Sequence, residues 1–199
     1  KYADNLEETK ESLTVIHRQA ILMKSMTEQI LEISKAQHLQ WSDLKPICLS
    51  TLVANYCQGQ ERKWAESPIA FEVSIQPDLW IQGDAVLVTR ILDNLLSNAV
   101  KFTKTKVVIR LEASPAGAVL KVADDGIGIA PDHLSKIWDR FYQVEASRNK
   151  GLNSGIGLGL SFIKDIADLH RADVKIISEE GRGSLFCVNF PQIKDKTSV

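Results

Sequence analysis

Residues 94–102 read NLLSNAVKF, and this is the stretch that says most about the fold. Asn94, Asn98 and Lys101 recur at i, i+4 and i+7, so they share one face of a helix that is otherwise apolar. Two carboxamides and an ammonium group are costly to bury without partners. The phosphates and magnesium ion of a nucleotide would satisfy them, because amide oxygens suit a hard cation and lysine suits phosphate. The alternative interpretation of this segment alone is a solvated polar stripe.

The residues around this stretch predict where the helix begins and which side is buried. Asp84 is a typical N-cap residue, and the helix is expected to run from there to about Phe102. Six apolar residues at helical spacing predict the side that faces the core. They are Val86, Ile91, Leu92, Leu95, Leu96 and Ala99.

Short segments of alternating apolar and polar residues flank this helix and predict strands. The predicted strands are Ile69–Ile75, Leu79–Ile81, Val107–Leu111, Val119–Ala123, Val174–Ile177 and Ser184–Phe190. We expect the first two to pair across the turn at 76–78, and the next two to flank the turn at 115–117.

Proline and glycine mark the limits of the remaining elements. Pro46 is well placed as the first residue of a helix over 46–65, and further helices are expected over 131–138 and 158–170. Together with the strands they predict an α+β fold, a sheet of mostly antiparallel strands with helices on one face. Residues 143–157 (QVEASRNKGLNSGIG) are polar, glycine-rich and too long for a tight turn, so they are predicted to form a mobile lid.

Two further clusters combine reactive side chains with glycine or aromatic residues. Residues 124–128 read DDGIG at the exit of a predicted strand. Glycines there let the backbone approach a flat ligand, and a carboxylate can accept the amino hydrogens of a base such as adenine. The same segment is also a common turn. Residues 138–142 read WDRFY, and an aromatic run is more often core than site, but Arg140 lies near a glycine-rich loop and is a candidate phosphate ligand.

The last cluster, GIGLGL at residues 155–160, opens a predicted helix. Its backbone N–H groups and the helix N-terminus form an anion site, as phosphate loops do. It is not a Walker A motif, because no GK[ST] follows. It is not the dinucleotide fingerprint either, because no strand immediately precedes it.

In this order and at this spacing, NLLSNAVKF, DDGIGI, WDRFYQ and GIGLGLS resemble the N, G1, F and G2 boxes of two-component sensor histidine kinases. GRGSLFCVNFP is similar to the final hairpin of that family, and the resemblance covers roughly residues 40–192. It implies the catalytic ATP-binding (HATPase_c) domain of the GHKL superfamily. The implied fold is the Bergerat-type two-layer α/β sandwich shared with gyrase-type ATPases, Hsp90 and the mismatch-repair ATPases.

The resemblance also implies a site for ATP and Mg²⁺. Asn98 would bind the metal, while Asn94 and Lys101 would contact the phosphates. Arg140 would approach the γ-phosphate and complete the expected catalytic set with those two phosphate-contacting residues. Asp124 would accept a hydrogen bond from the adenine amino group. The other residues expected to contact the nucleotide wall the pocket, make room for the base, or belong to the lid and the polyphosphate loop. They are Phe102, Gly126, Gly128, Phe141, Arg148, Lys150, Gly155, Gly157, Leu158, Gly159 and Leu160.

The sequence departs from the family pattern at several positions. Trp138 and Gln143 stand where Phe and Arg are usual, which is expected to tune packing of the lid, and residues 170–172 read HRA instead of His-Gly-Gly. The family's phosphoacceptor motif, a histidine followed by an acidic residue and arginine, is absent. His17 is followed by Arg and Gln and is expected to be an exposed helical histidine. The acceptor is therefore expected upstream of Lys1.

Residues 1–37 contain no Pro or Gly and consist mainly of helix formers. An a/d heptad pattern continues for about five heptads. Its positions are Tyr2, Leu6, Thr9, Leu13, Ile16, Ala20, Met23, Thr27, Ile30 and Gln37. Extra apolar residues widen the stripe, as in a four-helix bundle. By resemblance, residues 1–40 would be the second helix of a dimerisation and histidine-phosphotransfer domain, forming a homodimer through 1–37. An ATP-binding domain over 41–193 and a tail over 194–199 would follow.

Composition narrows the partners and the compartment. A formal net charge of −1 gives no electrostatic reason to expect nucleic acid. Cys48, Cys57 and Cys187 are widely spaced without CxxC or paired histidines, which favours reduced thiols in a cytosolic setting. No apolar stretch approaches the roughly 18 residues that cross a bilayer. We therefore expect this segment in the cytoplasm, and the resemblance leaves room for an inner-membrane anchor elsewhere in the parent protein.

The functional hypothesis is a histidine kinase core. The γ-phosphoryl group of ATP would pass to a stalk histidine and then to an aspartate in the receiver domain of a response regulator. One alternative is a gyrase- or chaperone-type ATPase. Those enzymes typically place a glutamate where Asn94 stands, and an asparagine cannot act as a base toward water. The other alternative is a non-catalytic nucleotide-binding dimerisation module, against which the intact nucleotide-binding boxes argue.

Overall fold

A computed structural model describes residues 39–144, 157–191 and 193, together with residues 9, 10, 12–17, 19–21, 23, 24, 27 and 31. The chain divides into two compact units, Lys1–His38 and Leu39–Val199. In the first unit all described residues are helical. Its large apolar side chains are exposed, at Leu13, Val15, Ile16, Ile21, Met23 and Leu31. Among the described residues, no helix combines the length and apolar character needed to cross a membrane.

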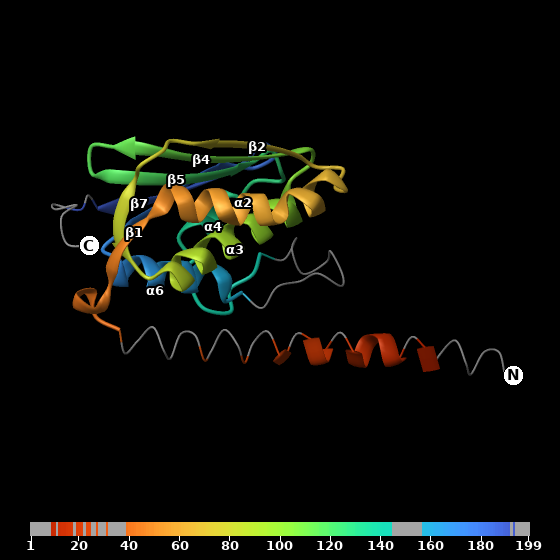
Figure 1. The fold of residues 1–199 in the computed structure, drawn as a ribbon. Coiled ribbons are helices and arrows are strands. Elements are labelled where there is room, and N and C mark those ends of the chain that lie inside the picture. Colours follow the sequence, from red (N-terminus) through yellow and green to blue (C-terminus); the bar gives the residue numbers. More distant parts are fainter. Residues whose placement is uncertain are drawn as a thin grey trace, which may run out of the picture. The chain divides into compact units, whose positions relative to one another are not determined.

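The second unit is a two-layer sandwich of a five-stranded sheet and helices. Its strands are β1 (Lys45–Cys48), β2 (Ala70–Ile75), β3 (Trp80–Gly83), β4 (Lys106–Ser114), β5 (Gly117–Asp124), β6 (Asp173–Glu179) and β7 (Gly183–Pro191). Its helices are the 3₁₀ turn η1 (Trp41–Asp43), α2 (Leu49–Ala65), α3 (Ala85–Phe102), α4 (Pro131–Leu134) and α6 (Gly159–Leu169). Figure 1 shows α2, α3 and α6 together on one face of the large sheet.

The large sheet has the strand order β2-β4-β5-β7-β6. Only β2 and β4 pair in parallel, and the other neighbours are antiparallel. The prediction of an α+β fold with a mostly antiparallel sheet is therefore confirmed. The hairpin of β4 and β5 also lies where the sequence predicted it.

The core lies between the sheet and the helices because the central strands and the helices α3 and α6 each bury one apolar face. On β4, Val107, Ile109 and Leu111 alternate with less buried residues and are themselves at most 2% exposed. On α3 the buried residues are Leu87, Val88, Ile91, Leu92, Leu95, Leu96 and Ala99. The prediction that Val86 faces the core is wrong. It is 64% exposed, because the buried stripe passes through the two residues after it.

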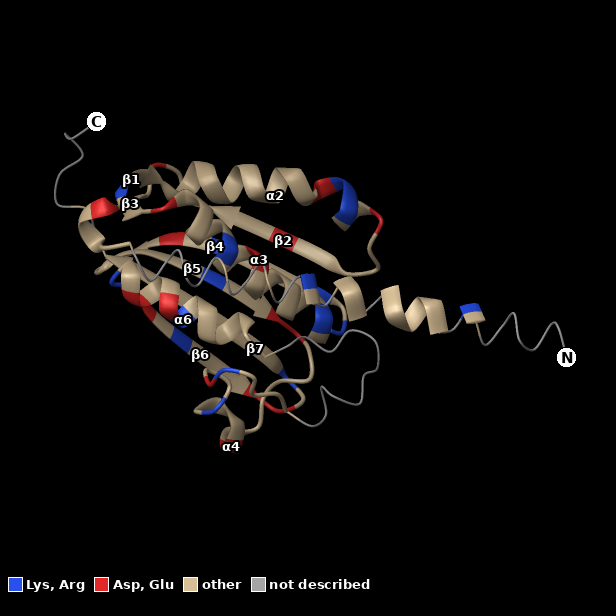
Figure 2. Ribbon diagram, turned by 90° about the horizontal axis from the view of Figure 1, so that it is seen from below, with Lys and Arg blue, Asp and Glu red and all other residues tan. Residues whose placement is uncertain are grey.

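The face of the sheet that the helices leave open carries paired charges. Lys106 on β4 pairs with Glu72 on β2 at 2.6 Å, and Lys121 on β5 pairs with Glu112 on β4. In the view of Figure 2, acidic and basic residues are interspersed among the elements. Local groups therefore decide which sites attract anions, in keeping with the small net charge.

The region around Pro46 differs from the sequence-based prediction. Pro46 lies in β1, which pairs antiparallel with β3 in a separate two-stranded sheet, and α2 begins only at Leu49. The predicted pairing of the segment near 79–81 with β2 is also wrong, since β2 pairs with β4 instead. Both differences have a tertiary cause: the carbonyl of Leu79 accepts from the N–H groups of Leu49 (2.8 Å) and Ser50 (3.4 Å), which fixes the start of α2.

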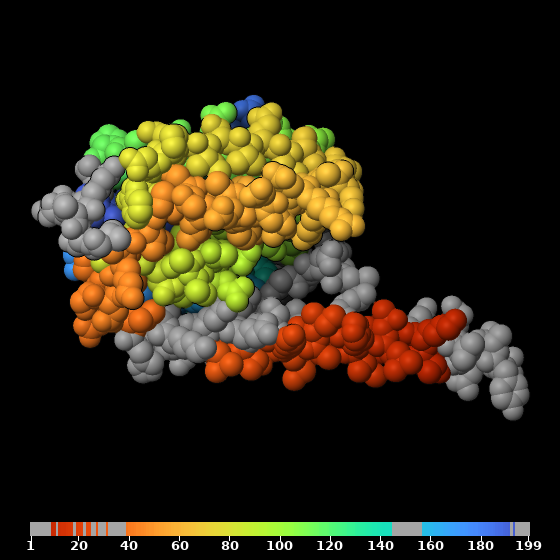
Figure 3. All heavy atoms as spheres, in the orientation of Figure 1, coloured from red at the N-terminus to blue at the C-terminus, as the bar shows by residue number. Residues whose placement is uncertain are grey.

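The other helices match more closely. α3 begins after Asp84 as predicted, and α6 agrees with the predicted helix to within one residue at each end. The helix predicted over 131–138 is only α4, because the chain beyond it continues in tighter turns. There the N–H groups of Lys136 and Asp139 bond to carbonyls three residues earlier. Figure 3 shows the orange surface of α2 beside the yellow-green surface of α3.

Candidate functional site

Three of the predicted clusters meet in space where α3, the exit of β5 and the start of α6 come together. Gly126 lies so close to the end of α3 that a Cβ there would be 2.1 Å from the carbonyl oxygen of Phe102. Gly159, the first residue of α6, lies so close to Asn94 that a Cβ there would be 2.6 Å from its Oδ1. The structure therefore brings the N, G1 and G2 segments to one place.

The G1 segment, at the exit of β5, is centred on Asp124. Its Oδ1 accepts a hydrogen bond from the N–H of Gly126 at 2.9 Å. Burial raises the pKa of Asp124, and the neighbouring charge of Asp125 raises it further. Hydrogen bonds from the N–H groups of Gly126 and Ser184 act in the opposite direction and lower this pKa. A carboxylate has about four acceptor positions, so these two donors leave room for an N–H donor from a ligand.

Asp125 has a different role from Asp124, and the sequence alone does not distinguish the two. Its Oδ1 accepts from the hydroxyl of Thr103 (2.6 Å) and from the N–H groups of Lys104 (2.9 Å), Thr105 (2.9 Å) and Lys106 (3.1 Å). Its Oδ2 accepts from the hydroxyl of Thr105. Although burial opposes it, these bonds hold the pKa of Asp125 well below the ordinary value. Asp125 therefore ties the turn after α3 to the end of β5.

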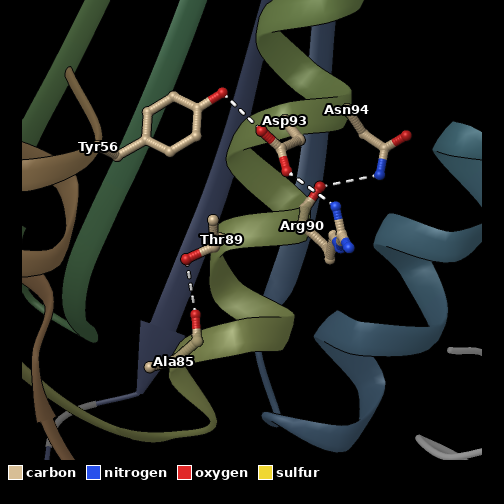
Figure 4. A network of polar contacts seen from close by, with 6 residues as sticks. All are labelled: Tyr56, Ala85, Thr89, Arg90, Asp93 and Asn94. Atoms are coloured by element: carbon tan, nitrogen blue, oxygen red, sulfur yellow. Dashed lines mark hydrogen bonds and ion pairs between the residues drawn. The ribbon is translucent and has the colours of Figure 1, made fainter. Parts of the chain in front are cut away.

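A polar network holds α3 against α2 next to Asn94 (Figure 4). The hydroxyl of Tyr56 on α2 donates to Oδ1 of Asp93 at 2.7 Å, and Arg90 pairs with Oδ2 of the same carboxylate at 3.3 Å. Burial and the bond to Asp93 raise the pKa of Tyr56. One residue further along α3, Nδ2 of Asn94 donates to the carbonyl of Arg90 at 2.8 Å. This bond turns the amide oxygen of Asn94 toward α6 and Gly159.

A buried histidine joins the other ends of α3 and α6. The side chain of Asp84 caps α3 by accepting from the N–H groups of Val86 (2.8 Å) and Leu87 (3.0 Å). The N–H of Asp84 donates to Nε2 of His170 at 3.0 Å, and Nδ1 of His170 donates to the carbonyl of Ile166 at 2.8 Å. Burial lowers the pKa of His170. The imidazole is therefore neutral and links α3 to the end of α6.

The turn after His170 explains one departure from the family pattern. Arg171 has a φ of 51°, a left-handed conformation that glycine adopts without cost. Its guanidinium lies 4.6 Å from the centre of the Trp41 ring. This cation–π contact offsets part of the cost of placing a side chain there.

The aromatic segment at 138–142 contacts β7, α4 and the loop before α6. Trp138 packs edge to face against Phe186, with 6.3 Å between the ring centroids. The hydroxyl of Tyr142 lies 2.7 Å from Nδ1 of His133. Phe141 has a φ of 66°, is 63% exposed, and donates its N–H to the carbonyl of Gly157 at 2.9 Å. This bond joins the segment to the loop that leads into α6.

The remaining predicted residues divide between described and undescribed parts of the chain. Asn98, Lys101 and Leu160 are partly buried, and Leu158 is 3% exposed. Nζ of Lys101 lies 4.8 Å from the centre of the Phe102 ring. Gly128 lies in the loop after β5, whose Ile127 carbonyl accepts from the N–H of Gly181 at 2.7 Å. The predicted residues that lie outside the described part are Arg148, Lys150 and Gly155.

The start of α6 can bind an anion, and the nearby amides can help bind a cation. The first N–H groups of any helix have no partner within it, so they favour negative charge. No cluster of three or more His, Cys, Asp or Glu residues suited to a metal occurs among the described residues. A Mg²⁺ ion held by one or two protein oxygens and by nucleotide phosphates needs no such cluster. The amide oxygens of Asn98 and Asn94 fit that requirement.

Two concavities of the described surface lie elsewhere. One of about 570 Å³ is on the open sheet face near Glu112 and Cys187, and one of about 480 Å³ lies between α2 and β2. Neither includes a predicted site residue. The candidate site therefore rests on the chemistry of the four clusters and not on the shape of the surface.

Comparison with known proteins places these features in a family. The family model described as "Histidine kinase-, DNA gyrase B-, and HSP90-like ATPase" matches residues 83–194. Sensor histidine kinase YkoH of Bacillus subtilis is 30% identical over 186 residues, which cover 94% of this chain and 40% of that protein. The phosphate regulon sensor protein PhoR of Pseudomonas aeruginosa is 31% identical over 194 residues, which cover 94% of this chain and 44% of that protein. The chain thus spans less than half the length of these relatives.

Solved structures share the fold. Full-length ShkA in complex with AMPPNP superposes with a TM-score of 0.68 at 25% identity, covering 85% of this chain and 36% of ShkA. The mycobacterial sensor histidine kinase MprB superposes with a TM-score of 0.62 at 24% identity, covering 74% of this chain and 97% of that chain. The prediction of a histidine-kinase-type two-layer sandwich is confirmed.

Proposed function

The chain belongs to the histidine kinase-, DNA gyrase B- and HSP90-like ATPase family, and we propose that its second unit binds ATP with Mg²⁺ and donates the γ-phosphoryl group to a protein histidine. The observation that carries the proposal is the meeting of Asp124, the amide-bearing face of α3 and the start of α6. The Asp124 carboxylate suits a base, the amides on α3 suit a cation, and the start of α6 suits an anion. Relatives named sensor histidine kinases, and a structural neighbour whose title names AMPPNP, support it.

In this proposal Asp124 recognises the base. Its half-buried carboxylate is already oriented by the N–H of Gly126 and would accept from the exocyclic amino group of adenine. Guanine presents a carbonyl oxygen at the corresponding position, and that oxygen would face a carboxylate. Asp124 therefore selects ATP over GTP.

Phosphates would bind at the start of α6, where helix N–H groups point outward. Asn98 would be a ligand of Mg²⁺, which neutralises charge on the phosphates. Asn94 presents its amide oxygen because its amide nitrogen is engaged by Arg90, so it is better suited to the cation than to direct contact with phosphate. Lys101 and Arg140 would supply positive charge, together with Arg148 and Lys150.

Phosphoryl transfer needs positioning and charge neutralisation more than covalent help from the enzyme. The residues at the site match that need. The proposed acceptor is a histidine of a helical stalk, from which the phosphoryl group would pass to a response-regulator aspartate. No carboxylate stands at position 94 to activate water, which favours transfer over hydrolysis.

The test is equilibrium binding of ATP and GTP, with Mg²⁺ present, to the unmutated chain and to the Asp124→Asn variant. We expect ATP to bind at least about tenfold more tightly than GTP. Asp124→Asn should weaken ATP binding at least about tenfold while the far-UV circular dichroism spectrum is retained. A folded Asp124→Asn variant with unchanged ATP affinity would remove Asp124 from base recognition.

A further inference from the structure

Arg140, a predicted phosphate ligand, forms an ion pair with Asp165, an acidic residue that lies outside the four clusters. Its Nη2 lies 2.9 Å from Oδ2 of Asp165 on α6, which is both an ion pair and a hydrogen bond. The two side chains are 49% and 39% exposed. Water and dissolved ions therefore reach this pair, and another anion can replace the carboxylate.

The backbone next to Arg140 starts close to the proposed phosphate site. Phe141 donates its N–H to the carbonyl of Gly157, two residues before α6 begins. From this point the arginine side chain can extend toward the start of α6 or along the helix.

In this structure the side chain extends along the helix. Asp165 is six residues after Gly159, and a helix rises 1.5 Å per residue, so Asp165 lies roughly 9 Å along the axis from the start of α6. The ion pair therefore draws the guanidinium of Arg140 toward the middle of α6, away from the N–H groups that would bind phosphate.

We infer that Asp165 is a positioning residue that holds Arg140 away from the phosphate site and competes with the nucleotide for its guanidinium. The inference rests on the proposed function, because it requires ATP to bind at the start of α6. Binding of ATP exchanges one anionic partner of Arg140 for another, and Asp165 sets how readily that exchange occurs.

The expected size of the effect follows from the exposure of the pair. Exposed ion pairs are weak, whereas a guanidinium binds phosphate oxygens with two charge-assisted hydrogen bonds, so the nucleotide wins the competition. Releasing Arg140 from Asp165 should cost ATP no more than about fivefold in affinity. The cost should fall on the triphosphate, because Arg140 is proposed to contact the γ-phosphate and ADP lacks that group.

The test compares Asp165→Asn with a matched control, Asp168→Asn. Asp168 is an exposed carboxylate on the same helix and forms no ion pair with any residue that the structure describes. Each substitution removes one negative charge from α6, so the control measures the change in background charge. Affinities for ATP and ADP are measured by calorimetry in MgCl₂, for both variants alone and combined with Arg140→Gln.

We expect Asp165→Asn to tighten ATP binding about two- to fivefold relative to Asp168→Asn, with no such gain for ADP. In the Arg140→Gln background the gain should disappear, because no guanidinium remains to be released. A gain equal to the control, a gain that persists without Arg140, or a loss of ATP affinity would overturn the inference. Failure of the unmutated chain to bind ATP would instead contradict the proposed function, and the inference with it.

Discussion

Replacing Asp125 by Ala should destabilise the second unit more than any other change to an exposed loop of the site. The substitution removes an acceptor of five hydrogen bonds, three from backbone N–H groups and two from threonine hydroxyls. Water can rebind most of these donors, so each bond is worth about 0.5–1 kcal/mol, and the loss totals about 3 kcal/mol. For a unit of this size that corresponds to a fall in melting temperature of roughly 6–12 °C.

The Asp125→Asn variant is the matched control. Four of the five bonds go to Oδ1, and only the Thr105 hydroxyl bonds to Oδ2. An asparagine with its oxygen in the Oδ1 position keeps those four acceptor contacts without the charge, so it should lose only about 1 kcal/mol.

The assay is thermal and urea unfolding of both variants followed by circular dichroism. Because the folded-state pKa of Asp125 lies below its ordinary value of 3.8, its contribution is fully present above that value and fades as the pH falls below it. The difference between Asp125→Ala and the unmutated chain should therefore be constant from pH 7 to about pH 5. An Asp125→Ala variant that melts within about 1 °C of the unmutated chain would refute this account of the turn.

Three further changes test other parts of the site. Burial lowers the pKa of His170 in the folded state below its unfolded-state value of 6.5. The contribution of the neutral imidazole to the free energy of unfolding is therefore fully present above pH 6.5 and is lost as the pH falls below that value. The melting temperature should thus drop between pH 7 and pH 5, and the drop should be smaller in His170→Gln; equal slopes would remove this histidine as the cause. Gly159→Ala places a methyl group against Oδ1 of Asn94, so the variant should fold normally but bind Mg²⁺·ATP about tenfold more weakly, and unchanged affinity would show that the contact is unimportant. Asn98→Ala should abolish the gain in ATP affinity that Mg²⁺ gives in calorimetry, and a retained gain would place the metal on other ligands.

The parts of the site that the sequence predicted are those that depend on neighbours along the chain. The i, i+4, i+7 spacing on α3 and the glycines at the start of α6 express their geometry within a few residues, so the pattern alone identifies them. The cap at Asp84 and the hairpin of β4 and β5 are local in the same sense.

Features that depend on distant contacts could not be predicted in this way. Pro46 suits the first turn of a helix as well as it suits an edge strand, and only the pairing of β1 with β3 decides between them. Asp125 stands beside Asp124 in the sequence, yet the two carboxylates have different partners. That of Asp125 bonds to the turn after α3, whereas that of Asp124 bonds to the N–H of Gly126. Asp165 looks like any exposed helical carboxylate until the structure places it beside Arg140.

The central claim is that this unit transfers phosphate to histidine, and the most direct measurement follows the fate of the γ-phosphate. The chain is joined to a helix that carries the family's phosphoacceptor motif, a histidine followed by an acidic residue and arginine. It is then incubated with γ-labelled ATP and Mg²⁺, and the label is recovered from protein and from solution. The proposal predicts protein-bound label that survives alkali, is lost in acid and persists in a His17→Ala variant. Label released as inorganic phosphate, with none on the protein, would show an ATPase and contradict the account.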